Sequence, residues 1–146
     1  MLFDDPVNTS SELWKTCIHE AAHAVVRRKL GFTITLVWVE GPGRGWVNFD
    51  LSRRLDKRWT PRERDLYWAV GTLAGPDAHE RLQWFFAPKG CEGDRARVDQ
   101  IVSRGLVTYA EVEANTKREV SRGWGTIKRE ARSLYLDAIR RGIEPN

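Results

Sequence analysis

The chain has 146 residues, of which 41% are hydrophobic and 30% are charged, and its formal net charge is +4. A chain of this length forms one compact domain that buries about 70% of its unfolded surface. Its composition excludes collagen-like, mucin-like and disordered proteins. It holds no apolar run long enough to cross a bilayer. Residues 1–8 carry Asp4 and Asp5 and lack the layout of a secretory signal, so we expect no membrane contact.

The charged residues and cysteines narrow the class of protein further. Eighteen arginines and six lysines are scattered among twenty acidic residues, which is typical of a solvated surface and makes nucleic-acid binding the less favoured explanation of the net charge. Most of the seven tryptophans have apolar neighbours, which favours a core or a hydrophobic groove over a base-stacking platform. Cys17 and Cys91 cannot form a disulfide framework, so we expect a reducing, cytoplasmic compartment.

The first predicted element is a helix over residues 10–30. Thr9 and Glu12 have the spacing of a capping box, and no glycine or proline follows before Gly31, which is a natural stop. Residues 32–39 are rich in β-branched and aromatic side chains and predict a strand.

The glycine-rich segment 41–45 predicts a loop. Residues 46–49 then predict a second strand, paired with the first or lying at an edge. The basic stretch 53–58 is typical of a solvated loop.

The rest of the chain is predicted to be helical. Capping signals and the positions of proline and glycine predict one helix from Thr60 to about 75–76 and a second from there to about 87–88. A loop is expected at 89–93. Apolar spacing and capping signals then predict a helix around 98–102 and a long helix from Thr108 to 142. Residues 123–125, Gly-Trp-Gly, are expected to break or bend the last helix. The sequence therefore predicts an α+β fold that is mainly helical, with one small β-sheet and a helical C-terminal part. Residues 1–9 are expected to form a flexible tail and 10–146 a single domain.

The motif that carries chemistry is His19-Glu20-Ala21-Ala22-His23, an H-E-x-x-H sequence inside the first helix. Residues four apart share a helix face, so both imidazoles can reach one Zn²⁺. Glu20 is placed to take a proton from a zinc-activated water, whose pKa such an ion lowers to about 7. The alternative is a pair of surface histidines on an amphipathic helix.

A catalytic zinc site needs three protein ligands and one open position, and the two histidines supply only two. No third histidine follows at the spacing of the extended motif, because Val26 and Lys29 occupy those positions. The third ligand must come from farther along the chain. The candidates are His79, Glu80, Cys91 and Asp94.

Four stretches carry a family likeness: HEAAHAVV at 19–26, VWVEGPGRGWV at 37–47, LAGPDAHE at 73–80 and GCEGD at 90–94. In the same order, they resemble motifs of the peptidase domain of the FtsH-type, ATP-dependent zinc metalloproteases. Those motifs are the H-E-A-G-H-A zinc helix, a strand with a P-R-G loop and an edge strand, L-G-G-R-x-A-E-E, and G-A-x-N-D. With the helical C-terminal part, the likeness covers residues 10–141.

This resemblance implies a zinc-dependent endopeptidase that hydrolyses peptides or unfolded protein. It implies that His19, His23 and Asp94 bind Zn²⁺ and that Glu20 is the general base. Glu80 is expected to orient a ligand histidine, with His79 beside the site.

The resemblance also identifies the segment that would bind substrate. The expected edge strand would bind an extended substrate as a further strand; its residues are Gly45, Trp46, Val47 and Asn48. Family members form hexameric rings, which suggests a homo-oligomer.

Several residues depart from the family pattern. Ala22, Ala74, His79, Gly93 and Arg95 replace family residues without removing a ligand. No G-x-x-x-x-G-K-[ST] loop is present, so the resemblance implies an ATPase acting in trans or substrates that are already unfolded. The alternative function is a zinc-stabilised interaction module of weak activity, such as an accessory or phage-type partner of an ATP-dependent protease.

Overall fold

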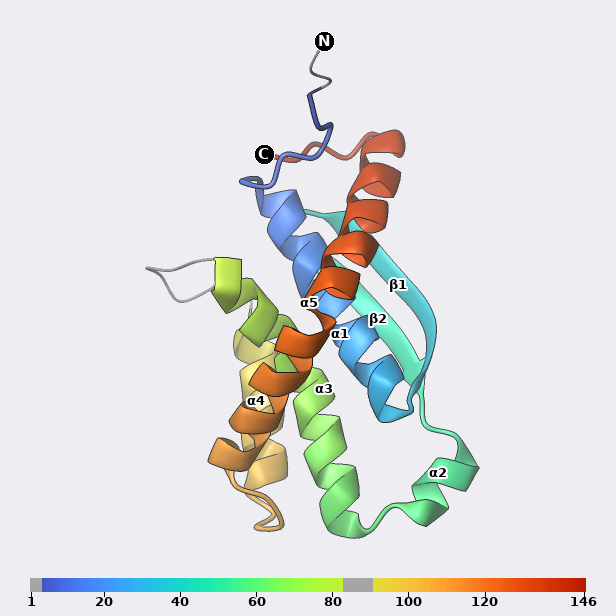
Figure 1. The fold of residues 1–146 in the computed structure, drawn as a ribbon, viewed down its shortest axis with the longest axis vertical. Helices are drawn as coiled ribbons and strands as arrows, with labels where there is room; N and C mark the ends of the chain where they lie inside the picture. Colours follow the sequence, from blue (N-terminus) through green and yellow to red (C-terminus); the bar gives the residue numbers. More distant parts are fainter. Residues whose placement is uncertain (1–3, 83–90) are drawn as a thin grey trace.

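The computed structural model describes residues 4–82 and 91–146, and within them the chain forms one β-hairpin and five helices. In chain order the elements are α1 (Glu12–Leu30), β1 (Thr33–Gly41), β2 (Arg44–Asp50), α2 (Arg53–Arg58), α3 (Pro61–Leu82), α4 (Glu92–Val102) and α5 (Tyr109–Arg140). Helix α1 is central and contacts α3, α5 and both strands (Figure 1). The predicted α+β class, mainly helical with one small sheet, is confirmed, and the structure shows that the sheet is antiparallel.

Small side chains allow α1 to pack closely on several sides at once. Ala21, Ala22 and Ala24 are fully buried in its middle, and Ala21 and Ala22 belong to the main hydrophobic core. The helix ends at Gly31, which has a φ of 109° and so takes the left-handed conformation predicted for it. The predicted end of this helix is therefore confirmed.

The N-terminus of α1 is capped differently from the prediction. Ser11 is the N-cap, and its hydroxyl oxygen accepts a hydrogen bond from the N–H of Trp14 at 3.1 Å. The cap expected at Thr9 is therefore two residues too early. The free N–H of Glu12 donates to the carbonyl oxygen of Asn146 at 3.2 Å, so the other end of the chain supplies a second acceptor.

The described part of the expected flexible tail is held against α5. Val7 is buried, and the N–H of Asn8 donates to the hydroxyl oxygen of Tyr135 at 3.2 Å. Asp5 pairs with Arg132 at 2.7 Å. Residues 5–8 therefore pack with the domain.

The two predicted strands form an antiparallel hairpin in which Trp38 lies opposite Trp46. Pro42 and Gly43 form its turn; Gly43 has a φ of 73°, which suits the second central position of a type II turn. The N–H of Gly43 donates to the hydroxyl oxygen of Thr16 at 2.7 Å. This bond fixes the end of the hairpin to α1 and thereby sets where β2 lies over that helix.

Helix α3 begins as predicted but continues past the expected break. The N–H of Glu63 donates to the Thr60 hydroxyl oxygen, and the N–H of Thr60 donates to the Glu63 carboxylate, each at 3.1 Å. The prediction that the helix ends at residues 75–76 is wrong, because α3 runs through Pro76 to Leu82. Proline removes one helical hydrogen bond, and the buried packing of this segment outweighs that loss. The helix end expected near 87–88 lies outside the described residues.

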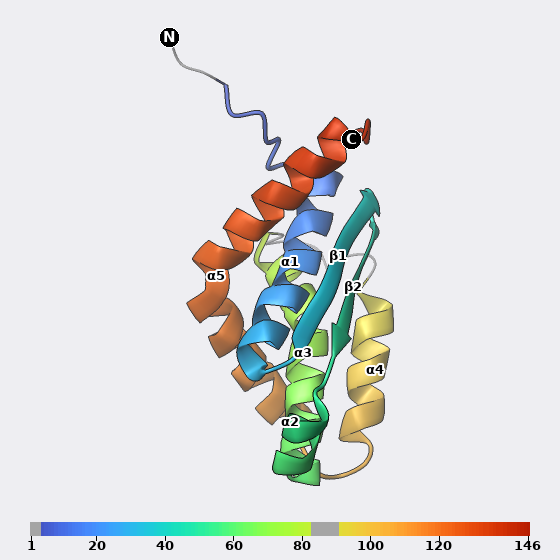
Figure 2. The same cartoon turned by 90° about the vertical axis from the view of Figure 1, so that its right-hand side faces the viewer.

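Two other predictions had different outcomes. The basic stretch 53–58 is the short helix α2, capped by the Ser52 hydroxyl, and not a loop. Of the two outcomes expected for residues 123–125, the bend is the one observed: α5 is continuous but changes direction near its middle (Figure 2). At Gly123 a Cβ would lie 3.2 Å from a methyl group of Val25, so the glycine allows α5 to approach α1 closely.

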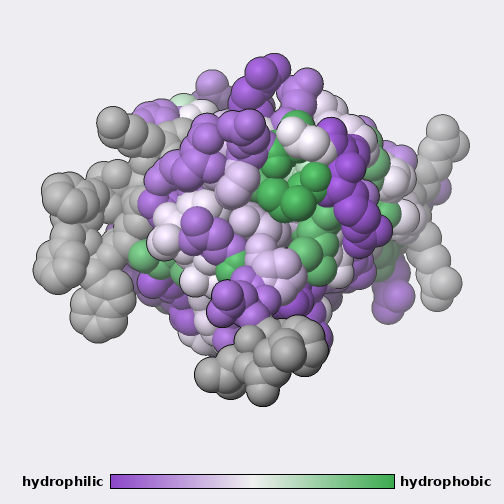
Figure 3. All heavy atoms as spheres, turned by 90° about the horizontal axis from the view of Figure 1, so that it is seen from above, coloured by the Kyte–Doolittle hydropathy of each residue, from purple (hydrophilic) through white to green (hydrophobic). Residues whose placement is uncertain are grey.

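The face of the molecule that carries the chain termini is mostly polar. Seen from the end that carries the chain termini, the molecule is mainly hydrophilic, with smaller hydrophobic patches between the hydrophilic side chains (Figure 3). Among the helices of residues 4–82 and 91–146, none combines the length and apolar character needed to cross a membrane.

Candidate metal centre

Helix α1 carries the three residues of the predicted motif that are able to do chemistry. His19 and His23 are one turn apart, and their Nε2 atoms approach to 3.0 Å. Their rings are nearly perpendicular, with centroids 4.7 Å apart. Both imidazoles therefore direct the same nitrogen to one point, as the i, i+4 spacing predicts.

Helix α4 brings Asp94 to this point. Its Oδ2 atom lies 3.0 Å from Nε2 of His19 and 3.2 Å from Nε2 of His23. The carboxylate lies two residues after the start of α4, where the helix holds its backbone. Of the four candidates for a third ligand, Asp94 is the one that the structure brings to both Nε2 atoms.

The three atoms have the separations expected of ligands on one ion. Ligands 2.0–2.1 Å from a tetrahedral Zn²⁺ lie about 3.3 Å from one another, and here the pairs are 3.0, 3.0 and 3.2 Å apart. The side chains of His19 and Asp94 are 12% and 15% exposed, so one side of the group reaches solvent. This arrangement fits three protein ligands with a further position open.

Gly75 of α3 leaves the space that an ion would need. A Cβ at this position would lie 2.6 Å from Nε2 of His19 and closer still to Nε2 of His23. Any side chain would therefore occupy the volume next to both metal-binding atoms. Gly75 was not among the predicted site residues, although it lies on α3, which packs against the helix that carries His19 and His23.

The main chain of α3 orients His23. Nδ1 of His23 lies 2.9 Å from the carbonyl oxygen of Gly71. Because a carbonyl only accepts, Nδ1 carries a proton in this contact, and a His23 ring with that single proton would offer the lone pair of Nε2 to an ion. Gly71 and Gly75 are four residues apart, so both face α1, and this spacing was the signal that could have indicated their role.

Charge balance at the site involves a buried cation, Arg27, one turn after His23. Its guanidinium lies 4.0 Å from the centroid of the Phe49 ring. Burial lowers the pKa of Arg27 to about 10, although the carboxylates of Asp94 and Glu20 oppose the shift. Arg27 therefore remains charged at neutral pH and offsets negative charge around the site.

Asp94 is ionised at neutral pH. Burial alone would raise its pKa, but hydrogen bonds with His19 and His23 outweigh burial and hold the pKa of Asp94 well below its usual range. Its oxygen is thus available as an anionic ligand.

Glu20 is buried beside these ligands, with 7% of its surface exposed. Burial raises the pKa of Glu20 to about 7, although the neighbouring His19 opposes the shift. Gly45 of β2 covers this side chain, because a Cβ there would lie 2.8 Å from Cγ of Glu20. Glu20 is therefore enclosed between α1 and the hairpin.

The expected substrate strand is in place, but its residues face two sides. The described residues pair β2 with β1 only, so β2 is an edge strand. Since successive residues alternate between faces, Gly45 and Val47 face α1, whereas Trp46 and Asn48 face away and are exposed. Trp46, 43% exposed, is thus on the face opposite Glu20.

The structure does not bring Glu80 to the site. Its side chain is 59% exposed and lies 3.9 Å from Arg95. Glu80 also lines a cavity of about 690 Å³ together with residues of α3, α4 and α5, among them Asp77 and Lys117. His19, His23 and Asp94 do not line that cavity. The carbonyl of Gly71, and not Glu80, contacts the imidazole of His23.

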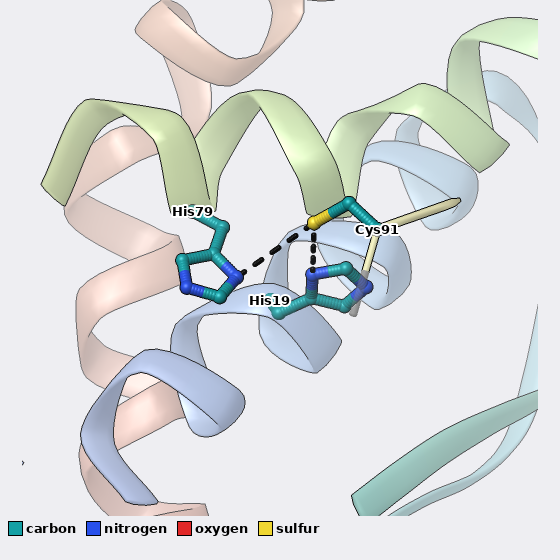
Figure 4. A group of neighbouring side chains, drawn as sticks. All are labelled: His19, His79 and Cys91. Carbon is teal, nitrogen blue, oxygen red and sulfur yellow. Dashed lines mark hydrogen bonds between the residues drawn. The ribbon is translucent and has the colours of Figure 1, made fainter. Parts of the chain in front are cut away.

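His79 is buried beside His19, as expected, with ring centroids 5.9 Å apart. Burial lowers the pKa of His79 to about 4, so its imidazole is neutral at pH 7. Cys91 lies between the two rings (Figure 4). Neither residue contributes to the group formed by His19, His23 and Asp94.

Comparison with known proteins found no matching family model, curated protein or solved structure. The likeness to FtsH-type peptidases therefore stands on the four sequence stretches alone.

Proposed function

We propose that this protein is a zinc-dependent metallopeptidase that hydrolyses peptides or unfolded protein segments. One observation carries the proposal: His19, His23 and Asp94 direct three ligand atoms to one point, with Glu20 buried beside it. The family likeness supports the same conclusion, including the assignment of Asp94 as a ligand.

The ion would be held by Nε2 of His19, Nε2 of His23 and Oδ2 of Asp94. When bound, it would supply Lewis acidity to a peptide carbonyl and to water. The proton of the Nδ1 atom of His23 is directed to Gly71, which keeps Nε2 available. The identity of the ion as Zn²⁺ rests on two imidazoles and one carboxylate, which are the ligands that catalytic zinc sites use.

Glu20 is the proposed general base. It follows the first ligand histidine, and its enclosure by Gly45 keeps the carboxylate at the site. It would take a proton from the attacking water and transfer it to the leaving amine.

The free edge of β2 is the proposed substrate-binding element. An extended peptide paired with this edge would lie next to Gly45, and Gly45 covers Glu20. Such pairing needs an unfolded substrate. An ATPase partner or a substrate that is already flexible would meet this need.

The test compares wild type with Glu20→Gln and a control, Glu12→Gln, which lies on the same helix with 57% of its side chain exposed. Wild type should bind about one zinc per chain, measured by mass spectrometry of the metal, and cleave a fluorescent unfolded protein. Glu20→Gln should keep the zinc and lose cleavage by about 100-fold or more, as loss of a general base does. Equal cleavage by Glu20→Gln, or none by zinc-loaded wild type, would refute the proposal.

A structural role is the second candidate, and one observation favours it. The three ligands join α1 to α4 across 75 residues of sequence, so an ion there would cross-link the fold. In that case zinc would raise the stability of the protein, no cleavage would occur, and Glu20→Gln would bind a protein partner as wild type does.

A further inference from the structure

A second group of ligand atoms lies on the other side of His19. Sγ of Cys91 is 3.8 Å from Nδ1 of His19 and 3.8 Å from Nδ1 of His79. The three ligand atoms all lie within 4.8 Å of one another. Figure 4 shows both rings turning a nitrogen toward the sulfur.

These separations fit ligands on one ion. With S and N ligands at 2.3 and 2.0–2.1 Å from a tetrahedral ion, the sulfur and nitrogen atoms lie about 3.5 Å apart. The observed 3.8 Å is close to that value. A small shift of the side chains would therefore bring all three atoms within bonding distance of a cation.

Ordinary structural roles do not explain the two residues that complete this group. Cys91 is the N-cap of α4, yet its side chain makes no capping hydrogen bond. His79 is 8% exposed, and its Nε2 atom is buried with no hydrogen-bond partner in the described structure. Buried imidazoles are normally hydrogen-bonded, whereas Nδ1 of His79 faces the sulfur of Cys91 at 3.8 Å.

We propose that Cys91, His79 and Nδ1 of His19 form a second cation site, which takes thiophilic ions such as Cd²⁺ or Cu⁺ in preference to hard ions such as Mg²⁺. The preference follows from the ligands, since thiolate and imidazole bind soft and borderline cations. The site does not depend on peptidase activity, and it would exist in a protein that hydrolyses nothing.

The two groups share His19, through different nitrogens. Nε2 faces His23 and Asp94, and Nδ1 faces Cys91. A neutral imidazole has one lone pair for a metal, so His19 serves one ion at a time unless its remaining proton is displaced.

The test is a Cd²⁺ titration of the full chain, followed by the ultraviolet absorption band of sulfur-to-metal charge transfer. Wild type and Asp94→Ala should both develop the band, because the second group does not use Asp94. Cys91→Ser should lose it. His79→Ala should weaken Cd²⁺ binding by more than about tenfold, since even loss of an outer partner of a metal ligand costs about 10–100-fold.

Cys17→Ala is the matched control, because Cys17 is the other buried free cysteine and is absent from the ligand groups found in the described residues. It should keep the band at full strength. An unchanged affinity in His79→Ala would reveal binding by a single thiol and overturn the proposal. So would a wild-type titration without the band, or a band that is lost in Cys17→Ala and kept in Cys91→Ser.

Discussion

Replacement of Gly75 by alanine should separate metal binding from folding. The added methyl group would lie within 2.6 Å of the Nε2 atoms of both His19 and His23. Both side chains are largely buried, so a methyl group at position 75 would compete with an ion for the space beside them. We therefore expect Gly75→Ala to fold and to lose its zinc.

Two opposing effects set the stability of the metal-free variant. Alanine favours a helix interior over glycine by about 0.8–1.0 kcal/mol, whereas overpacking a buried site costs about 1–3 kcal/mol. The free energy of unfolding without metal should therefore change little or fall by up to about 2 kcal/mol. Zinc at 100 times its dissociation constant adds about 2.7 kcal/mol to wild type, and this increment should be absent from Gly75→Ala.

The assay is urea denaturation with zinc and with a chelator, together with metal analysis of the purified protein. Gly125→Ala is the matched control, because Gly125 also lies within a helix and a Cβ there meets its nearest atom, of Arg129, at an ordinary 3.6 Å. This control should gain about 0.8–1.0 kcal/mol and keep the full response to zinc. If Gly75→Ala retains the zinc increment of wild type, the metal centre does not occupy the space beside Gly75.

Three further substitutions test how the fold positions the site. Thr16→Val removes the acceptor for the N–H of Gly43 and should lower the free energy of unfolding by about 1 kcal/mol; an unchanged urea midpoint would contradict the role given to this bond. Gly43→Ala should cost about 1–2 kcal/mol, because its φ of 73° is left-handed although a Cβ there has no atom within 4 Å; thermal unfolding measures this. A hydrogen bond from the N–H of Thr108 is the main cause that lowers the pKa of Glu111. The stability it supplies is complete above the ordinary carboxyl pKa and is lost as pH falls through the lowered one. Glu111→Gln should therefore lose less stability than wild type on acidification, and parallel pH profiles of the two proteins would refute this.

The local parts of the site could be predicted from the sequence. The spacing of His19 and His23 within one helix determines that their rings share a face, whatever the rest of the chain does. The helix end at Gly31 and the two strands follow in the same way from short-range preferences. Residue types and spacing left four candidates for the third ligand, and only the family likeness selected Asp94.

Features of the fold and the site that depend on contacts between separate helices could not be predicted from the sequence. The proximity of Gly75 to both rings is set by how α3 packs on α1, and no local pattern encodes that distance. The local preference of Pro76 predicts a helix end, but burial of the surrounding segment of α3 outweighs it. Glu80 was assigned to the site by analogy, whereas its position on α3 exposes it to solvent.

The hydrogen bond from His23 to the carbonyl oxygen of Gly71 has a consequence for mutagenesis. Every amino acid carries that same oxygen, so a saturation library at this codon never deletes the acceptor. Any loss of function in such a library would follow side-chain volume, since a Cβ at Gly71 meets the aliphatic part of Arg27 at 2.7 Å. Backbone chemistry, such as an ester in place of the next amide, would be needed to weaken the acceptor itself.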